Sequence, residues 1–223
     1  MKIIATSDLH IGAEDCNVNS LRKFLIEEAP KADVVILGGD VFDLWIGNLG
    51  SLISKNKKIV EAISRLKEVY WITGNHDSEA INLSPLIKKS ITIQEKLVLT
   101  LSDNRKLIFT HGHEFDEELG KYYFWAKLGY QILNVFRRTW DFDLTDFHKS
   151  ERYIKIVERH KEKSLETYNN YGIIMSGHTH VPYCEKHDEL GGIYLINTGD
   201  WVESNSYVII EDGKDPELIT NYS

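Results

Sequence analysis

The chain has 223 residues, of which 42% are apolar and 27% charged, and its net charge is −8. This composition is typical of a globular protein with a core of ordinary size. The acidic balance argues against a protein whose main task is nucleic-acid binding, because such binding depends on Lys and Arg that neutralise phosphates. The two cysteines, Cys16 and Cys184, have no zinc-like spacing.

The opening ten residues turn polar too soon for a secretory signal. No apolar run approaches the ~20 residues that cross a bilayer. We therefore expect a cytoplasmic protein with reduced thiols, which touches at most the inner membrane surface.

The first part of the chain alternates short apolar runs with helical periodicity. Apolar runs predict buried strands at residues 2–6, 33–40 and 69–77. Between them, apolar residues three and four apart predict helices over 18–29, ended by Pro30, and over 52–67. This alternation predicts an α/β fold with a mostly parallel sheet covered by helices.

Hairpin signals and one helical block fill the rest of the chain. Residues 96–113 predict a hairpin with Asp103-Asn104 at its tip, and glycine turns predict further hairpins near residues 191–192 and 212–213. Between these β-rich parts, residues 116–170 have helical spacing. No repeat or linker divides the chain, so we expect one domain over residues 1–223 with a helical insertion or lid at about 116–170.

Five polar stretches each follow a predicted strand, and they contain six of the nine histidines. They are Asp8-Leu9-His10, Gly39-Asp40 with Asp43, Gly74-Asn75-His76-Asp77, His111-Gly112-His113, and Gly177-His178-Thr179-His180. Each stretch alone fits a turn or a helix cap. Loops that leave neighbouring strands at one edge of an α/β sheet meet around a ligand. The occurrence of all five stretches at strand ends, in this order, therefore favours one shared site.

The residue types of these stretches suit a pair of divalent metal ions. Carboxylate, imidazole and amide oxygen bind Mn²⁺, Fe²⁺ or Zn²⁺, and the absence of thiolates argues against a structural zinc site. An aspartate that bridges two ions holds them about 3.5–4 Å apart, and such a pair acidifies water and stabilises charge during attack on phosphorus. The stretches therefore predict phosphoryl chemistry.

In order and composition the five stretches resemble the motif set of the calcineurin-like metallophosphoesterases, from residue 8 to residue 180 and with a similar ending, INTGDW, at 196–201. The resemblance implies a two-sheet β-sandwich flanked by helices, with the metals at its edge. It implies two divalent ions, Mn²⁺ first and Fe²⁺, Zn²⁺ or Mg²⁺ as alternatives. The implied ligands are Asp8, His10, Asp40 and His180 for one ion, and Asp40, Asn75, His111 and His178 for the other.

The same resemblance implies that His76 binds no metal but steadies the phosphate and protonates the leaving oxygen. Asp43 or Asp77 then orients His76, and Asp43 is preferred, as a carboxylate that raises imidazole basicity. His113 is assigned near the metals or against the phosphate, or it is simply exposed.

Within the superfamily, GGDVFDLWIGN and residues 110–138 look similar to the UDP-2,3-diacylglucosamine diphosphatase branch, whose members carry a helical insertion beneath which acyl chains pack. This implies a lipid-linked substrate. Arg137 and Arg138 are candidates for diphosphate binding, and Tyr122 and Trp125 for the apolar part. Two positions differ, since that branch usually has Arg in place of His76 and Asp in place of His113.

Three functions follow from these patterns. The first is a metal-dependent phosphoesterase that cleaves a phosphate ester or diphosphate, with a UDP-sugar lipid as one substrate. The second is a phosphodiesterase for small soluble phosphates or cyclic nucleotides. The third is a non-catalytic, metal-binding scaffold in which exposed aromatic residues of the helical block contact a partner.

Overall fold

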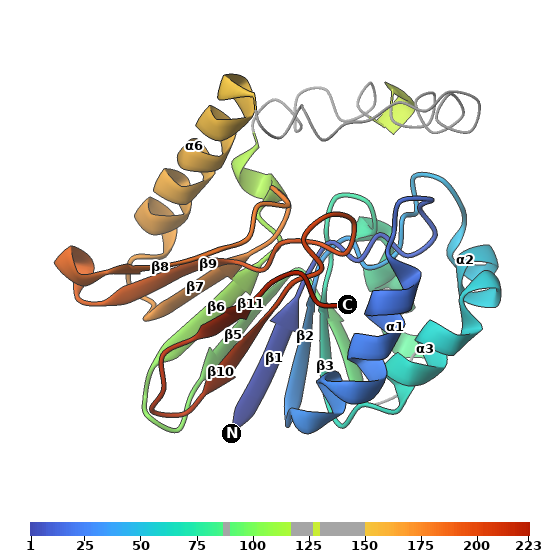
Figure 1. The fold of residues 1–223 in the computed structure, drawn as a ribbon, viewed down its shortest axis with the longest axis horizontal. Coiled ribbons are helices and arrows are strands. Elements are labelled where there is room, and N and C mark those ends of the chain that lie inside the picture. Colours follow the sequence, from blue (N-terminus) through green and yellow to red (C-terminus); the bar gives the residue numbers. More distant parts are fainter. Residues whose placement is uncertain (87–89, 117–126, 130–149) are drawn as a thin grey trace.

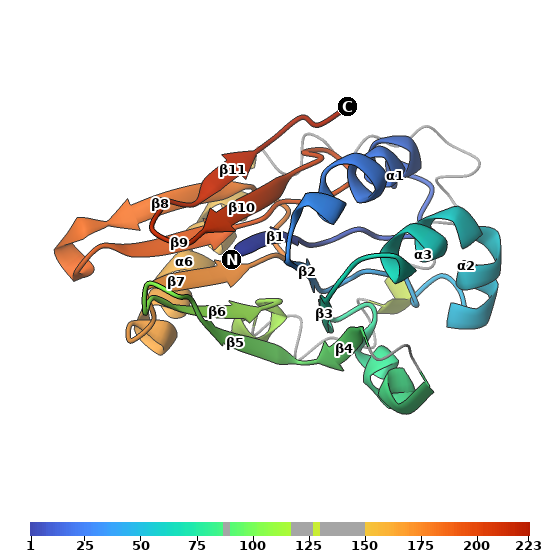
Figure 2. The same ribbon diagram turned by 90° about the horizontal axis from the view of Figure 1, so that it is seen from below.

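The computed structural model describes residues 1–86, 90–116, 127–129 and 150–223. Their strands form two sheets (Figures 1 and 2). The first sheet has the order β11-β10-β1-β2-β3-β4. Its strands are β1 (Lys2–Thr6), β2 (Val34–Gly38), β3 (Val69–Ile72), β4 (Ile91–Gln94), β10 (Tyr207–Glu211) and β11 (Glu217–Ile219). Strands β1 to β4 pair in parallel, and β10 pairs antiparallel with both β1 and β11.

The second sheet has the order β5-β6-β7-β9-β8. Its strands are β5 (Lys96–Thr100), β6 (Lys106–Thr110), β7 (Ile173–Ser176), β8 (Tyr183–His187) and β9 (Ile193–Asn197). Strands β6, β7 and β9 pair in parallel, whereas β5 and β8 pair antiparallel at the two edges. The two-sheet α/β fold implied by the family resemblance is therefore confirmed.

Helices cover the outer faces of both sheets. Figure 1 shows α1 (Val18–Glu27), α2 (Leu49–Lys55) and α3 (Lys57–Ser64) on one side and α6 (Glu151–Tyr168) on the other. Short 3-10 helices are η1 (Ala29–Lys31), η2 (Ser78–Leu86), η3 (His113–Phe115) and η4 (Asp188–Leu190). Within the described ranges, no helix is long and apolar enough to cross a membrane.

The core has three parts that follow the alternation of side chains along each strand. Between the sheets, Ile3 and Ala5 of β1 share a cluster with Phe109 of β6 and Met175 of β7. Ile4, on the opposite face of β1, packs in the cluster that contains α1 and α3. A third cluster joins α6 to the outer face of the second sheet. This double packing fixes the ends of the parallel strands of both sheets, where the polar stretches begin.

Two predicted helices differ in the structure. The helix expected over 18–29 ends at Glu27, and Pro30 lies in η1, because proline has no N–H for a continuing helix and suits the start of a new turn. The helix expected over 52–67 is two helices that meet at Asn56, whose side-chain amide donates to the Leu52 carbonyl at 3.0 Å. The three predicted hairpin regions are present, as β5–β6, β8–β9 and β10–β11.

Candidate metal centre at the strand ends

The five polar stretches meet where β1, β2, β3, β6 and β7 end. The described part of the chain contains three overlapping groups of possible ligand atoms, and within each group the atoms lie within 4.8 Å of one another. The groups are Asp8, His10 and His180; His10, Asp43 and His76; and Asp8, Asp40 and His111. Asp8 and Asp40 thus connect motifs that are up to 172 residues apart in sequence, as the strand-end argument predicts.

The backbone at the predicted ligands is unusual. Five of them have positive φ angles, between 45° and 68°, in the left-handed region that L-residues rarely adopt. They are Asp8, His10, Asp40, His178 and His180. Residues held in this region cost about 1–3 kcal/mol each and cluster at functional sites. Tight turns here point side chains from separate loops at one volume.

One half of the centre is built around Asp8. The Nε2 atom of His180 lies 3.3 Å from Asp8 Oδ1 and 3.3 Å from His10 Nε2. His180 Nδ1 contacts the carboxylate of Asp200 at 2.8 Å. Because that carboxylate accepts the Nδ1 proton, a neutral His180 directs its Nε2 lone pair at Asp8 and His10.

The other half is built around Asp40. His111 Nε2 lies 3.4 Å from Asp40 Oδ2 and 3.1 Å from Asn75 Oδ1, while its Nδ1 lies 3.0 Å from the Gly38 carbonyl. A carbonyl only accepts, so Nδ1 carries the proton and the Nε2 lone pair of a neutral imidazole faces oxygen atoms. The ring of His178 lies 5.3 Å from that of His111, between centroids.

The donor set fits divalent cations. Asp8 Oδ1 is buried without a hydrogen bond among the described residues, and it lies 3.3 Å from His180 Nε2 and 3.9 Å from His10 Nε2. Without a cation, protons take up the excess negative charge: burial alone lowers the pKa of His111, but Asp40 and Asp8 outweigh it and raise this pKa to about 10. Metal ligands of this kind are deprotonated when a cation binds, so the cation replaces the proton.

His76 lies beside these atoms but is held differently. Its Nδ1 is 3.0 Å from Asp43 Oδ1, its Nε2 is 3.9 Å from Asp40 Oδ2, and its backbone N–H donates to Asp40 Oδ1 at 2.8 Å. Burial lowers the pKa of His76, but Asp40 and the hydrogen bond to Asp43 outweigh it, and the pKa is raised. The geometry thus favours the protonated form.

Of the two carboxylates expected to orient His76, Asp43 contacts its ring, whereas the carboxylate of Asp77 accepts hydrogen bonds from other residues. Asp77 accepts from the backbone of Gly74 and Val41, at 2.6 and 2.8 Å, and from the indole of Trp71 at 2.9 Å. Burial and Asp40 raise the pKa of Asp77 to about 6. Asp77 therefore ties the β2 and β3 loops together.

The remaining predicted residues fall into two groups. His113 is half-buried beside the centre, with its ring 5.4 Å from that of His111. Tyr122, Trp125, Arg137 and Arg138 lie outside the described residues, as does most of the expected insertion. Of that block, α6 and the short segment 127–129 are described.

Sequence reasoning missed three neighbours of the centre. Asp200 follows β9 and holds His180, and the strand-end rule that identified the other motifs also applies to it. Asp116 Oδ2 lies 3.6 Å from His178 Nε2. Trp45 stacks on His76 with ring centroids 3.8 Å apart, and its indole N–H donates to the Asn75 carbonyl at 3.1 Å.

Comparison with known proteins gives a family match over most of the chain. A family model described as calcineurin-like phosphoesterase matches residues 1–182. A UDP-2,3-diacylglucosamine hydrolase from Coxiella burnetii is 37% identical over 75 residues, which cover 32% of this chain and only 30% of that protein's length. A protein of the same name from Aeromonas hydrophila is 24% identical over 96% of both chains.

Solved structures show the same fold at low identity. A single-mutant Vps29 from Entamoeba histolytica has a TM-score of 0.51 at 14% identity, over 99% of each chain. Vacuolar Protein Sorting 29 from Cryptosporidium parvum has a TM-score of 0.51 at 17% identity, over 100% of this chain and 98% of that one.

Proposed function

We propose a function from the premise that the chain belongs to the calcineurin-like phosphoesterase family: it is a metal-dependent hydrolase of a phosphate ester or diphosphate bond. One observation carries this proposal. Ring nitrogens of His10, His180 and His111 lie close to the buried carboxylates of Asp8 and Asp40, in a set of ligand atoms that divalent cations would suit.

Two cations would share the cluster, with Mn²⁺ as the favoured ion. Asp40 lies within 4.0 Å of ring nitrogens from both halves, which supports it as the bridging residue. Divalent ions at such a site acidify a water molecule and stabilise negative charge that develops on phosphate oxygens. The ligands proposed for one ion are Asp8, His10, Asp40 and His180, and for the other Asp40, Asn75, His111 and His178.

His76 would act as the acid. A protonated His76 close to Asp40 Oδ2 faces the same volume as the ligands, so it can steady a phosphate oxygen and donate a proton to the leaving oxygen. Asp43 holds the Nδ1 side of the ring, so the proton would be transferred from Nε2, which lies 3.9 Å from Asp40 Oδ2. Trp45 fixes the plane of the ring by stacking.

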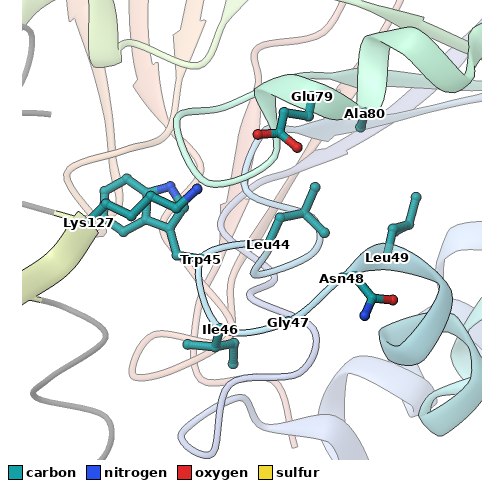
Figure 3. A pocket seen from close by; sticks show the side chains of 9 residues that line it. All are labelled: Leu44, Trp45, Ile46, Gly47, Asn48, Leu49, Glu79, Ala80 and Lys127. Carbon is teal, nitrogen blue, oxygen red and sulfur yellow. The ribbon is translucent and has the colours of Figure 1, made fainter. Parts of the chain in front are cut away.

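A cavity next to His76 supports a substrate with an apolar part. It has a volume of about 520 Å³, and Figure 3 shows the loop 44–49 on one side and Glu79 and Ala80 of η2 on the other. Most of the described residues that line it are apolar, with Leu44, Trp45 and Leu49 among them, and two of the described residues, Glu79 and Lys127, are charged. Trp45 lines the cavity and also stacks on His76, so one residue connects the cavity with the proposed acid.

The relatives named UDP-2,3-diacylglucosamine hydrolase suggest the finer proposal. We infer that the substrate is a diphosphate that joins a nucleoside to an acylated sugar, with an acyl group in this cavity. In the same account, residues 1–223 form one domain in which residues 116–170 are a helical insertion beside the site.

A second candidate is a phosphodiesterase for small soluble or cyclic nucleotide phosphates. The presence of His76 where the lipid diphosphatase branch usually has Arg favours it. This candidate uses the same metals and the same acid, but it leaves the apolar cavity without a role.

The test compares three substrates with metal-stripped protein, with and without added Mn²⁺: a UDP-linked acylated sugar, bis-p-nitrophenyl phosphate and p-nitrophenyl phosphate. Mn²⁺-dependent cleavage of the lipid diphosphate well above both chromogenic esters is the expected result. Activity on the small esters alone would favour the second candidate. No Mn²⁺-dependent cleavage of any substrate by folded, metal-loaded protein would contradict a hydrolase of this kind.

A further inference from the structure

Helix α6 contacts the middle residue of one of the two His-x-His loops of the centre. The hydroxyl of Tyr153, in the first turn of α6, donates a hydrogen bond to the backbone carbonyl of Thr179. Thr179 separates His178 from His180, which are proposed to bind different ions. Tyr153 is 9% exposed and Thr179 3%, so water competes little for this bond.

The same helix contacts the middle of the other loop. His160 packs against Gly112, which separates His111 from His113 and has a φ of 104°. A side-chain carbon at Gly112 would clash with His160 Nε2, so the glycine lets the helix approach the loop. The ring of His160 also meets the edge of Phe115 at 5.4 Å and lies 6.5 Å from the ring of His178.

These two contacts come from one face of the helix. Tyr153 and His160 are seven residues apart, which is two turns, and Val157 lies between them on the same side. All three are buried, and Val157 packs with Ile174 of β7 in the cluster under α6. Figure 1 shows α6 beside η3, the turn at residues 113–115 that continues from the His111-Gly112-His113 loop.

His160 has properties that packing alone does not require. It is 4% exposed, and within the described residues neither ring nitrogen has a hydrogen-bond partner. An apolar residue would fill the same space without the cost of burying two polar atoms. Its Nε2 atom faces Gly112, and its ring lies near that of His178, a proposed ligand of the second ion.

We propose that Tyr153 and His160 are positioning residues that hold the two His-x-His loops at the spacing the cations require. The proposal rests on the metal centre described under the proposed function. Neither residue is a proposed ligand of an ion. They hold the loop residues between the ligands, so the position of α6 sets the affinity for metal. Residues that act through the ligands in this way typically change metal affinity about 10–100-fold.

Three variants in the full-length chain test this proposal: Tyr153→Phe, His160→Ala and, as a matched control, Val157→Ala. Val157 lies on the same buried face, but the contacts with Thr179 and Gly112 are made by Tyr153 and His160. Each metal-stripped protein is titrated with Mn²⁺ by calorimetry, and its melting temperature is measured without metal. Val157→Ala is expected to melt at a lower temperature and bind Mn²⁺ as the unchanged chain does.

Tyr153→Phe is expected to weaken Mn²⁺ binding roughly tenfold, while its metal-free melting temperature falls by no more than that of Val157→Ala. His160→Ala is expected to weaken binding by at least as much. Tyr153→Phe deletes a single hydroxyl and remains decisive if His160→Ala does not fold. Binding within twofold of the unchanged chain for Tyr153→Phe would overturn the inference alone, whereas an unchanged chain that binds no Mn²⁺ would overturn the proposed function as well.

Discussion

The indole of Trp45 lies parallel to the imidazole of His76, with centroids 3.8 Å apart and planes inclined by 14°. The same indole donates its N–H to the carbonyl of Asn75, the residue before His76, at 3.1 Å. Trp45 thus fixes both the ring and the backbone of the loop after β3. Since it also lines the apolar cavity, it joins the proposed acid to the proposed acyl site.

Replacing Asp43 should change the pH range of activity. The hydrogen bond that His76 Nδ1 donates to Asp43 helps to raise the pKa of His76, and the proposed mechanism needs the protonated ring. Protonation is lost as the pH rises through this pKa, so Asp43→Asn, which lowers the pKa, should move the alkaline fall in kcat to lower pH. The measurement is a pH–rate profile of metal-loaded protein. An alkaline limb at the same pH in both proteins would contradict the role of Asp43.

Removing the imidazole should separate binding of metal from turnover. His76→Ala leaves all seven proposed ligands in place, so two Mn²⁺ should still bind. Turnover should fall by about 10²–10⁴, the usual contribution of a positioned acid. Metal content and kcat measured on the same sample check this, and a variant that loses its metal would show that His76 has been given the wrong role.

Gly74 should be intolerant of a side chain for a reason specific to the centre. A methyl group there would clash with the carboxylate and the backbone nitrogen of Asp40, the proposed bridge. Gly74→Ala should therefore weaken Mn²⁺ binding by tenfold or more. Gly172→Ala is the matched control, because its added carbon would meet atoms only at 3.8 Å or beyond. The measurement is the Mn²⁺ affinity of both variants by calorimetry. Equal affinities would show that the Asp40 loop moves to accommodate the methyl group.

The apolar cavity gives a prediction about the substrate. Leu44→Ala shortens one wall without touching His76, so the KM for an acylated substrate should rise about 5–10-fold with kcat little changed, consistent with the loss of a few buried methylene groups. The KM for bis-p-nitrophenyl phosphate should stay the same. Ile26→Ala, at an exposed position on α1, is the control. An equal change in KM for both substrates would show that the cavity does not bind the acyl group.

Much of the centre could be predicted from the sequence, because parallel strands end at one edge and their loops must meet there. Asp8, Asp40, His111 and His180 are brought together as this rule requires. The family match confirms the resemblance drawn from the five motifs. The same rule applies to Asp200, which follows β9 within the INTGDW ending, but that ending alone does not indicate that Asp200 contacts His180.

Other features depend on packing that spacing does not reveal. The break at Asn56 comes from a local hydrogen bond that competes with helix continuation. The stacking of Trp45 on His76 joins loops after different strands, and a tryptophan 31 residues away has no sequence signal for that contact. The contacts of Tyr153 and His160 with two loops similarly follow from where α6 lies against the second sheet, which helical periodicity leaves undetermined.

The most direct test of the central claim is a titration of metal-stripped protein with Mn²⁺, in which bound metal and hydrolysis of bis-p-nitrophenyl phosphate are measured in the same samples. The account predicts two ions per chain and hydrolysis that rises as both sites fill, with Asp40→Asn losing metal and activity together. Stoichiometric binding that survives in Asp40→Asn, or hydrolysis that is equal with and without Mn²⁺, would contradict it.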